Sequence, residues 1–366
     1  MHIPDGYLSP GTCAALYAGA APFWWAALRR LRRTLRAQLV PRLSLVAAFS
    51  FVVMMFNIPL PGGTTGHAVG AALATIVLGP AASILAISTA LAIQAFFFGD
   101  GGITSLGANC FNIAIVGSLV AFPVYRAIAG RSTLESARRV VAAGLAGYAA
   151  INASALVAAI EFGLQPMFFR DASGAPLYCP YPLGVAVPVM MLGHLTIAGI
   201  AEFVLTGGVV AFLQRTDVAL LAGTAGSHVR SNPNAAGAAV PGSLRPLWAA
   251  LGVLLVLTPL GLLAGGAAWG EWSASEMADP AARETIAASS LHDAPPASPP
   301  AGLERLATVW TAPLPDYAPP FLRSRALGYL LSAMFGAGLV VLAASAMAAL
   351  LGFRCHSRPA DHTVIP

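Results

Sequence analysis

The sequence contains no lysine, and charged residues of all kinds make up only 10% of its 366 residues. Soluble globular proteins carry about 25% charged residues, so this scarcity argues against an ordinary soluble domain. Hydrophobic residues account for 57% of the chain, and its mean hydropathy is +0.74. Together these figures indicate a polytopic membrane protein.

Several motifs that carry chemistry are also missing. The chain has no GxxxxGK[ST] motif, so it carries no phosphate-binding loop of an ATPase. It has neither the HExxH motif of zinc proteases nor the GxSxG motif of hydrolases. Its four cysteines are scattered without a CxxC spacing, which argues against a zinc site and against a disulfide framework. The arginine-rich segments lack interleaved aromatic residues, which argues against nucleic-acid binding.

A transmembrane helix needs about 20 mostly apolar residues. Nine segments follow this pattern: 8–28, 43–60, 67–79, 81–98, 109–125, 140–162, 184–213, 246–268 and 327–351. The third is short, and Gly79-Pro80 separates it from the fourth, so the two could form one broken pass or two tightly joined passes. We therefore expect an all-α polytopic membrane protein. The distribution of arginines among the connecting segments favours two passes at Gly79-Pro80.

All 20 basic residues are arginine. With nine spans and an N-terminus outside, the cytoplasmic side receives six arginines in 29–42, four in 126–139, three in 214–245 and two in the tail. The outside then holds five, as the positive-inside rule requires. Merging the third and fourth spans would move segment 126–139 with its four arginines to the outside, which the rule disfavours. The first seven residues lack the positive region of a signal peptide, so we expect Met1 to begin an outward-facing tail.

The chain divides into two parts. Residues 1–215 hold seven spans with short loops, and 216–245, rich in Gly, Ala, Ser, Asn and Pro, is typical of a linker. Residues 246–352 hold two spans around an outside loop, 269–326, whose proline-rich stretch predicts partial flexibility.

The first two residues could form a metal chelate. The α-amino group of Met1, the backbone amide nitrogen of His2 and the His2 imidazole can close fused rings around one ion. The amide must lose its proton, which a strongly polarising late transition metal achieves. Nitrogen donors in one plane suit Ni(II), Cu(II) or low-spin Co(II), and a fourth donor would complete the plane.

A second histidine could supply that donor. His67 ends the sequence PGGTTGH at the outer end of the third span, and the topology derived from arginines places it on the same side as His2. Neighbouring glycines allow another backbone to approach closely. Each histidine alone is better explained as a solvated or locally hydrogen-bonded side chain. Together they favour a metal site of Met1, His2 and His67.

Two ionisable residues lie within the seventh span. His194 and Glu202 are eight residues apart and therefore share a helical face. Ionisable groups at membrane depth are costly and often functional. The alternatives are an intramembrane metalloenzyme that uses this pair and a polar contact that fixes helix packing, of which packing is favoured. A purely structural or assembly subunit is a further alternative.

Four polar residues could support the chelate without ligating the metal. Asn57, Asn109 and Asn112 could hydrogen-bond to ligating residues, as second-layer partners of metal sites do. Asp5 could orient His2 or cap the first helix at Ser9, and the sequence leaves this open.

The sequence MHIPDG at 1–6, His67 after its Gly-Thr-rich loop, and GDGGITSLGAN at 99–109 strongly resemble the CbiM/NikM family. These proteins are the substrate-capturing S components of energy-coupling-factor transporters for cobalt and nickel. The resemblance implies a seven-helix fold with its N-terminus threaded into an outward-facing pocket. It also implies ligation by the Met1 amine, the amide and imidazole of His2, and the His67 imidazole.

The C-terminal part resembles the CbiN/NikN, or PDGLE-type, accessory module, with PAGLE at 300–304 and Ala301 where the pattern has Asp. The chain is thus identified as a natural fusion that is not itself an enzyme. The resemblance implies Ni2+ or Co2+ as the transported substrate and a location in the plasma (inner) membrane. It implies a membrane T component (CbiQ/NikQ-like) and cytoplasmic ATPases (CbiO/NikO-like) as partners. It does not separate nickel from cobalt.

Overall fold

Helices dominate the computed structural model, which describes residues 1–34, 39–224 and 244–350. Within these ranges the only sheet is a two-stranded antiparallel hairpin of β1 (Ile58–Leu60) and β2 (Thr64–Gly66). The predicted all-α class is therefore confirmed. Most of the predicted linker and the C-terminal tail lie outside the described residues.

The described residues of the first part, 1–34 and 39–216, form nine α-helices, some of which continue through short π-helical segments. The α-helices are α1 (Pro10–Thr34), α2 (Leu39–Met54), α3 (Ala71–Leu78), α4 (Pro80–Ile93), α5 (Leu106–Asn109), α6 (Gly117–Ala129), α7 (Ala137–Phe168), α8 (Leu183–Gly193) and α9 (Gly199–Thr216). The π-helical segments are η1 (Gln94–Phe98), η2 (Cys110–Val116) and η3 (His194–Ala198).

Five helical runs of the described chain are long and apolar enough to cross a membrane. They are Pro80–Phe98, Leu106–Ala129, Ala137–Phe168, Leu183–Thr216 and Arg325–Met347. Each of them overlaps one predicted span, so an integral membrane protein is confirmed. Two further apolar helical runs are shorter, Leu39–Met54 and Leu247–Leu263.

The third predicted span differs from expectation. The helix α3 has only eight residues, a length of about 12 Å that cannot cross a hydrocarbon core of about 30 Å. Gly79, with a φ of 82°, reverses the chain, and the Thr75 hydroxyl donates to Ser83 Oγ at 3.0 Å. The segments thus form a tight hairpin rather than one broken pass; α3 alone does not make a complete third span, and the exact number of spans stays a prediction.

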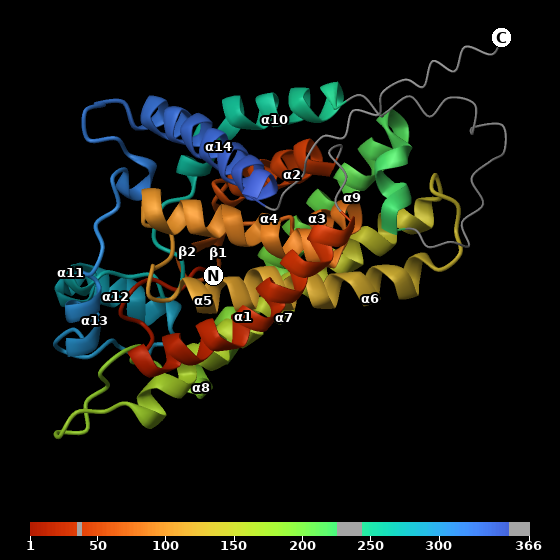
Figure 1. Cartoon of the computed structure of the whole chain (residues 1–366). Coiled ribbons are helices and arrows are strands. Elements are labelled where there is room, and N and C mark those ends of the chain that lie inside the picture. Colours follow the sequence, from red (N-terminus) through yellow and green to blue (C-terminus); the bar gives the residue numbers. More distant parts are fainter. Residues whose placement is uncertain (35–38, 225–243, 351–366) are drawn as a thin grey trace, which may run out of the picture.

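The C-terminal part contributes α10 (Arg245–Leu257), a 3₁₀ segment η6 (Thr258–Leu263) and the long α14 (Arg325–Leu350). In Figure 1, α10 and α14 lie on the side of the molecule where α2 runs. The loop between them contains α11 (Ala274–Ala278), α12 (Pro280–Ser289), α13 (Ala301–Leu306) and a 3₁₀ turn, η7 (Pro315–Tyr317).

Parts of the loop 269–326 are helical, while partial flexibility of its proline-rich stretch stays a prediction. Ser273 and Glu276 form a capping box at α11, and Asp279 caps α12. Trp269 and Trp272 are buried, so these residues anchor the loop to the rest of the chain.

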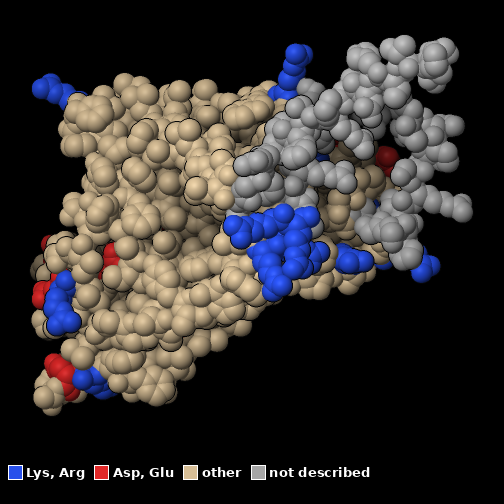
Figure 2. Space-filling model, viewed as in Figure 1, with Lys and Arg blue, Asp and Glu red and all other residues tan. Residues whose placement is uncertain are grey.

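Charged side chains gather at the two ends of the molecule. Figure 2 shows acidic side chains at the end where Figure 1 places α11–α13, and a basic group over the last turns of α1, where Arg29, Arg30, Arg32 and Arg33 lie. The face between them is almost free of charge. This separation is what the positive-inside rule requires, while the orientation itself stays a prediction.

The helices α14 and α2 approach closely at a glycine. An ideal Cβ on Gly336 would lie 2.1 Å from Phe51 Cζ, whereas one on Gly338 would meet nothing within 4 Å. Nearby, the Tyr329 hydroxyl donates to the Met55 carbonyl at 2.7 Å. The C-terminal part therefore packs directly against the first part.

We expect Gly336→Leu to force α14 away from Phe51 and to cost about 1–3 kcal/mol through overpacking. Gly338→Leu makes the same change in helix propensity and hydrophobicity on the open side of α14. Thermal unfolding of the detergent-purified chain should show a clearly lower midpoint for the first variant only. Equal midpoints would contradict the close packing of α14 against α2.

Candidate metal centre

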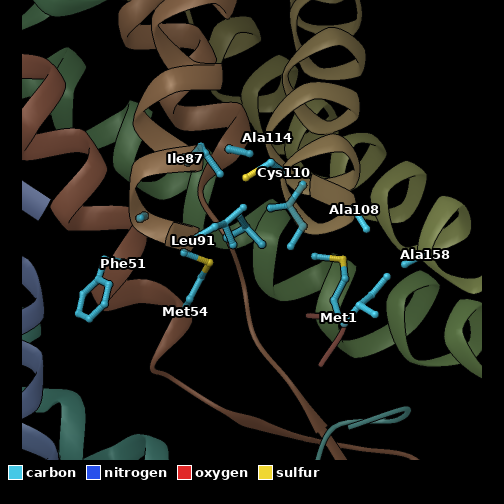
Figure 3. Close-up of a cluster of buried hydrophobic side chains, with 14 of the residues drawn as sticks. Met1, Phe51, Met54, Ile87, Leu91, Ala108, Cys110, Ala114 and Ala158 are labelled. Atoms are coloured by element: carbon cyan, nitrogen blue, oxygen red, sulfur yellow. The ribbon is translucent and has the colours of Figure 1, made fainter. Parts of the chain in front are cut away.

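The N-terminal residues lie inside the molecule rather than in solvent. Figure 1 places the N-terminus among the helices, near the β1–β2 hairpin. Met1, His2 and Ile3 are 4%, 1% and 0% exposed. Figure 3 shows the Met1 thioether within the apolar cluster that also contains Ala108 and Ala158. This apolar anchor fixes where the first two residues lie.

The loop 99–109 holds the backbone of Ile3. Gly102 N–H donates to the Ile3 carbonyl at 2.9 Å, and the Ser105 hydroxyl donates to the same oxygen. The Asn109 side chain accepts from Ile3 N–H at 2.8 Å and donates to the Ile3 carbonyl at 3.0 Å. The backbone N–H and C=O of Ile3 are therefore both satisfied, as buried backbone requires.

Asp5 ties the two sequence motifs together. Its carboxylate accepts from Ile103 N–H at 3.1 Å, from Thr104 N–H at 2.7 Å and from the Thr104 hydroxyl. It therefore neither orients His2 nor caps the first helix, the two roles that the sequence suggested. The predicted support from Asn112 is not present either, because Asn112 donates to Glu161 at 2.7 Å instead.

The structure brings His2 and His67 together. Their ring centroids are 4.9 Å apart with an angle of 56° between the planes. His67 lies between β2 and α3, is 7% exposed, and its Nδ1 is 3.0 Å from the Ala68 carbonyl. Burial, with the positive charges of His2 and the N-terminus, lowers the pKa of His67 to about 3. His67 is therefore neutral, as a metal-ligating imidazole must be.

Two carboxylates touch the proposed chelate. Glu271 Oε1 accepts from the Met1 ammonium at 3.0 Å, and Asp100 Oδ1 bonds His2 Nδ1. Asp100 also accepts from the Tyr317 hydroxyl at 2.6 Å. Burial alone would raise the pKa of Asp100, but His2 and the Tyr317 hydrogen bond together lower it below its ordinary value. Glu271 and Tyr317 both belong to the C-terminal part.

Glu202 and His194 have separate structural roles. The Glu202 carboxylate accepts from Val69 N–H at 2.7 Å and from Gly70 N–H and the Thr206 hydroxyl, so it holds the segment that carries His67. His194 Nδ1 is 2.8 Å from the Met190 carbonyl one turn earlier. Nowhere in residues 1–34, 39–224 and 244–350 do three His, Cys, Asp or Glu side chains converge as a metal site. The packing interpretation therefore fits this pair better than the metalloenzyme alternative.

Residues 2–220 match the model of a protein family described as the cobalt uptake substrate-specific transmembrane region, CbiM. The chain belongs to the CbiM family. Residues 245–352 match the model of the PDGLE domain, so the predicted fusion of a CbiM/NikM-type part with an accessory module is confirmed. Members of this family are transport components, so the prediction that the chain is not an enzyme is confirmed as well.

Curated members and relatives of the CbiM family resemble the chain over most of its length. It is 57% identical over 341 residues to the fused nickel transport protein NikMN of Rhodobacter capsulatus, covering 93% of this chain and 95% of that protein. It is 33% identical over 225 residues to the cobalt transport protein CbiM of Geobacter sulfurreducens, covering 61% and 62% of the two chains. A crystal structure of a truncated transition metal transporter shares 48% identity at a TM-score of 0.55, covering 59% of this chain and 99% of that one.

Sequence reasoning missed three residues of the site: Asp100 as a partner of His2, and Glu271 and Tyr317 as contacts from the accessory part. Asp100 lies within the GDGG sequence, which indicated only a loop, so its contact with His2 was not predicted. Glu271 and Tyr317 are 270 and 217 residues away from their partners, and no periodicity links them.

We expect Glu202→Gln to loosen the segment that carries His67. Glutamine can accept through one oxygen only, so at least one of the three donors is left unpaired, at a cost of about 1–3 kcal/mol. Hydrogen exchange measured on residues 64–70 should become faster. Glu161→Gln is the matched control, because Glu161 is another buried glutamate, and within the described residues its carboxylate accepts one hydrogen bond, from Asn112 on η2. Equal exchange in both variants would contradict the anchoring role of Glu202.

Proposed function

We propose that the chain is the substrate-binding S component of an energy-coupling-factor transporter that imports Ni2+ or Co2+. The Met1 amine, the His2 amide and imidazole, and the His67 imidazole bind the ion as cargo. The observation that carries this proposal is the burial of the first two residues beside His67, with 4.9 Å between the two imidazole rings. Relatives named as nickel and cobalt transport proteins support the choice of ions.

The local geometry suits a chelate of nitrogen donors. Met1 and His2 supply adjacent donors from one short stretch of backbone, and His67 approaches from a separate element. Oxygen-preferring ions such as Mg2+ and Ca2+ have little affinity for such a set, whereas late transition ions prefer it. The carboxylates of Glu271 and Asp100 occupy the amine and the His2 Nδ1 here, so the ion must exchange with them.

Transport requires partners that the chain does not contain. We propose a membrane T component of the CbiQ/NikQ type and cytoplasmic ATPases of the CbiO/NikO type, because the sequence has no phosphate-binding loop. In this assembly residues 1–215 capture the ion outside the plasma membrane. Residues 216–245 form the linker to the accessory module, residues 246–352. The N-terminus then faces outward and the C-terminus faces the cytoplasm.

We expect His2→Ala, and separately one extra glycine before Met1, to lower Ni2+ and Co2+ uptake at least about 100-fold, since each removes a donor rather than an outer support. The measurement is radiolabelled metal uptake by cells that also produce the T component and ATPases. His194→Ala is the control, because within the described residues its imidazole hydrogen-bonds the Met190 carbonyl one turn earlier, so its loss should leave most uptake intact. Wild-type uptake by both test variants would overturn the proposed function.

A further inference from the structure

A groove of about 550 Å³ runs along the seam between the first part of the chain and α10 of the accessory part. Its walls come from α2, α3, α9 and α10, with Val77, Gly208 and Leu251 among the lining residues. Of the described residues that line it, Thr216 alone has a polar side chain, and its hydroxyl donates to the Phe212 carbonyl at 2.9 Å. The lining therefore favours an apolar occupant.

The groove is as long as one layer of lipid chains. Its lining on α9 runs from Leu205 to Thr216, a rise of about 16 Å at 1.5 Å per residue. The hydrocarbon core of a bilayer is about 30 Å thick, so one leaflet contributes about 15 Å. Phe212 and Val253 in the lining are 38% and 59% exposed, so the groove opens towards the surrounding membrane. An acyl chain of one leaflet therefore matches the groove in length and chemistry.

Three arginines flank one end of this groove. Arg42 lies on α2 one turn before the first lining residue of that helix, Arg215 lies in the last turn of α9, and Arg245 begins α10. Leu247, near the start of α10, packs against the same apolar cluster as Leu220, just after α9. The helix ends that carry the arginines are therefore at the same end of the groove.

This basic end can receive a negatively charged headgroup. Within the described chain, neither Arg42 nor Arg215 forms an ion pair with a carboxylate. Asp217 is the nearest acidic residue in sequence, so the three arginines leave a net positive charge. Trp248, which is 48% exposed beside the start of α10, is typical of the level at which headgroups meet hydrocarbon.

We propose that the groove binds one anionic phospholipid, with an acyl chain between α9 and α10 and its headgroup at Arg42, Arg215 and Arg245. The apolar lining selects no lipid by itself, because lipid tails are as apolar as leucine. The arginines supply the selection, since basic pockets between membrane helices bind anionic headgroups. The bound lipid bridges the first part of the chain and the accessory helix, and its site shares no residue with the proposed metal centre.

The first test fills the groove. Gly208 lines it, and an ideal Cβ there would meet nothing within 4 Å, so Gly208→Leu puts a side chain into the groove without a clash. Gly252→Leu is the matched control, because Gly252 on α10 is equally open but does not line the groove. Native mass spectrometry follows the detergent-purified full-length chain as dioleoyl phosphatidylglycerol is added. Gly208→Leu should bind this lipid at least about tenfold more weakly than the control, because the side chain overpacks the site.

The second test removes the charge. Arg42→Gln with Arg215→Gln should weaken phosphatidylglycerol binding about 25-fold, at about fivefold for each arginine near an anionic headgroup. Binding of dioleoyl phosphatidylcholine should not change, and high salt should narrow the difference between the two lipids. The matched control is Arg32→Gln with Arg33→Gln, which removes two exposed arginines of α1 and gives the same net charge.

The outcomes separate a lipid site from other uses of the groove. Equal phosphatidylglycerol binding by Gly208→Leu and Gly252→Leu would overturn the proposal, and so would equal binding of the two lipids by the wild type. An unchanged lipid preference in the Arg42 and Arg215 double variant would overturn it as well. If Gly208→Leu lost the T component or a second copy of the chain while lipid binding stayed the same, the groove would belong to a protein partner instead.

Discussion

The structure depends on the burial of a charged chain terminus. Placing an ammonium group in a protein interior costs several kcal/mol unless a carboxylate and hydrogen bonds compensate. Here the Met1 ammonium meets Glu271, and the apolar cluster around the Met1 side chain holds it there. Because Glu271 comes from the accessory part, the first residue of the chain is stabilised by a residue 270 positions away. The N-terminal segment and the accessory loop are therefore mutually dependent.

The remaining contacts of the N-terminal segment follow from this constraint. A buried strand-like segment must satisfy its backbone, and the loop 99–109 does so through Asn109, Ser105 and Gly102. Gly6 adopts a φ of 90°, and a Cβ there would lie 2.7 Å from the Leu303 backbone. The two motifs at 1–6 and 300–304 therefore meet at a glycine that has no room for a side chain.

Sequence reasoning reached much of this arrangement because its signals are local. Apolar runs located the helices, and the fused-ring chemistry of a terminal Met-His pair pointed to His2. It located the break at Gly79-Pro80, but hydropathy did not show that the helix before this break has only eight residues. It also left Asp5 and Glu202 undecided, since both act on backbone N–H groups of distant segments. A carboxylate that hydrogen-bonds a distant loop produces no recognisable residue spacing in the sequence.

The carboxylates around the donors explain how one site can be both stable and exchangeable. Without metal, Glu271 and Asp100 pair with the amine and with His2, so buried polar groups are not left unpaired. Under the proposed function the arriving ion replaces these two partners, and the freed carboxylates then face a cavity of about 470 Å³. This placement lets the nitrogen donors stay buried in both states while only the carboxylates change partners.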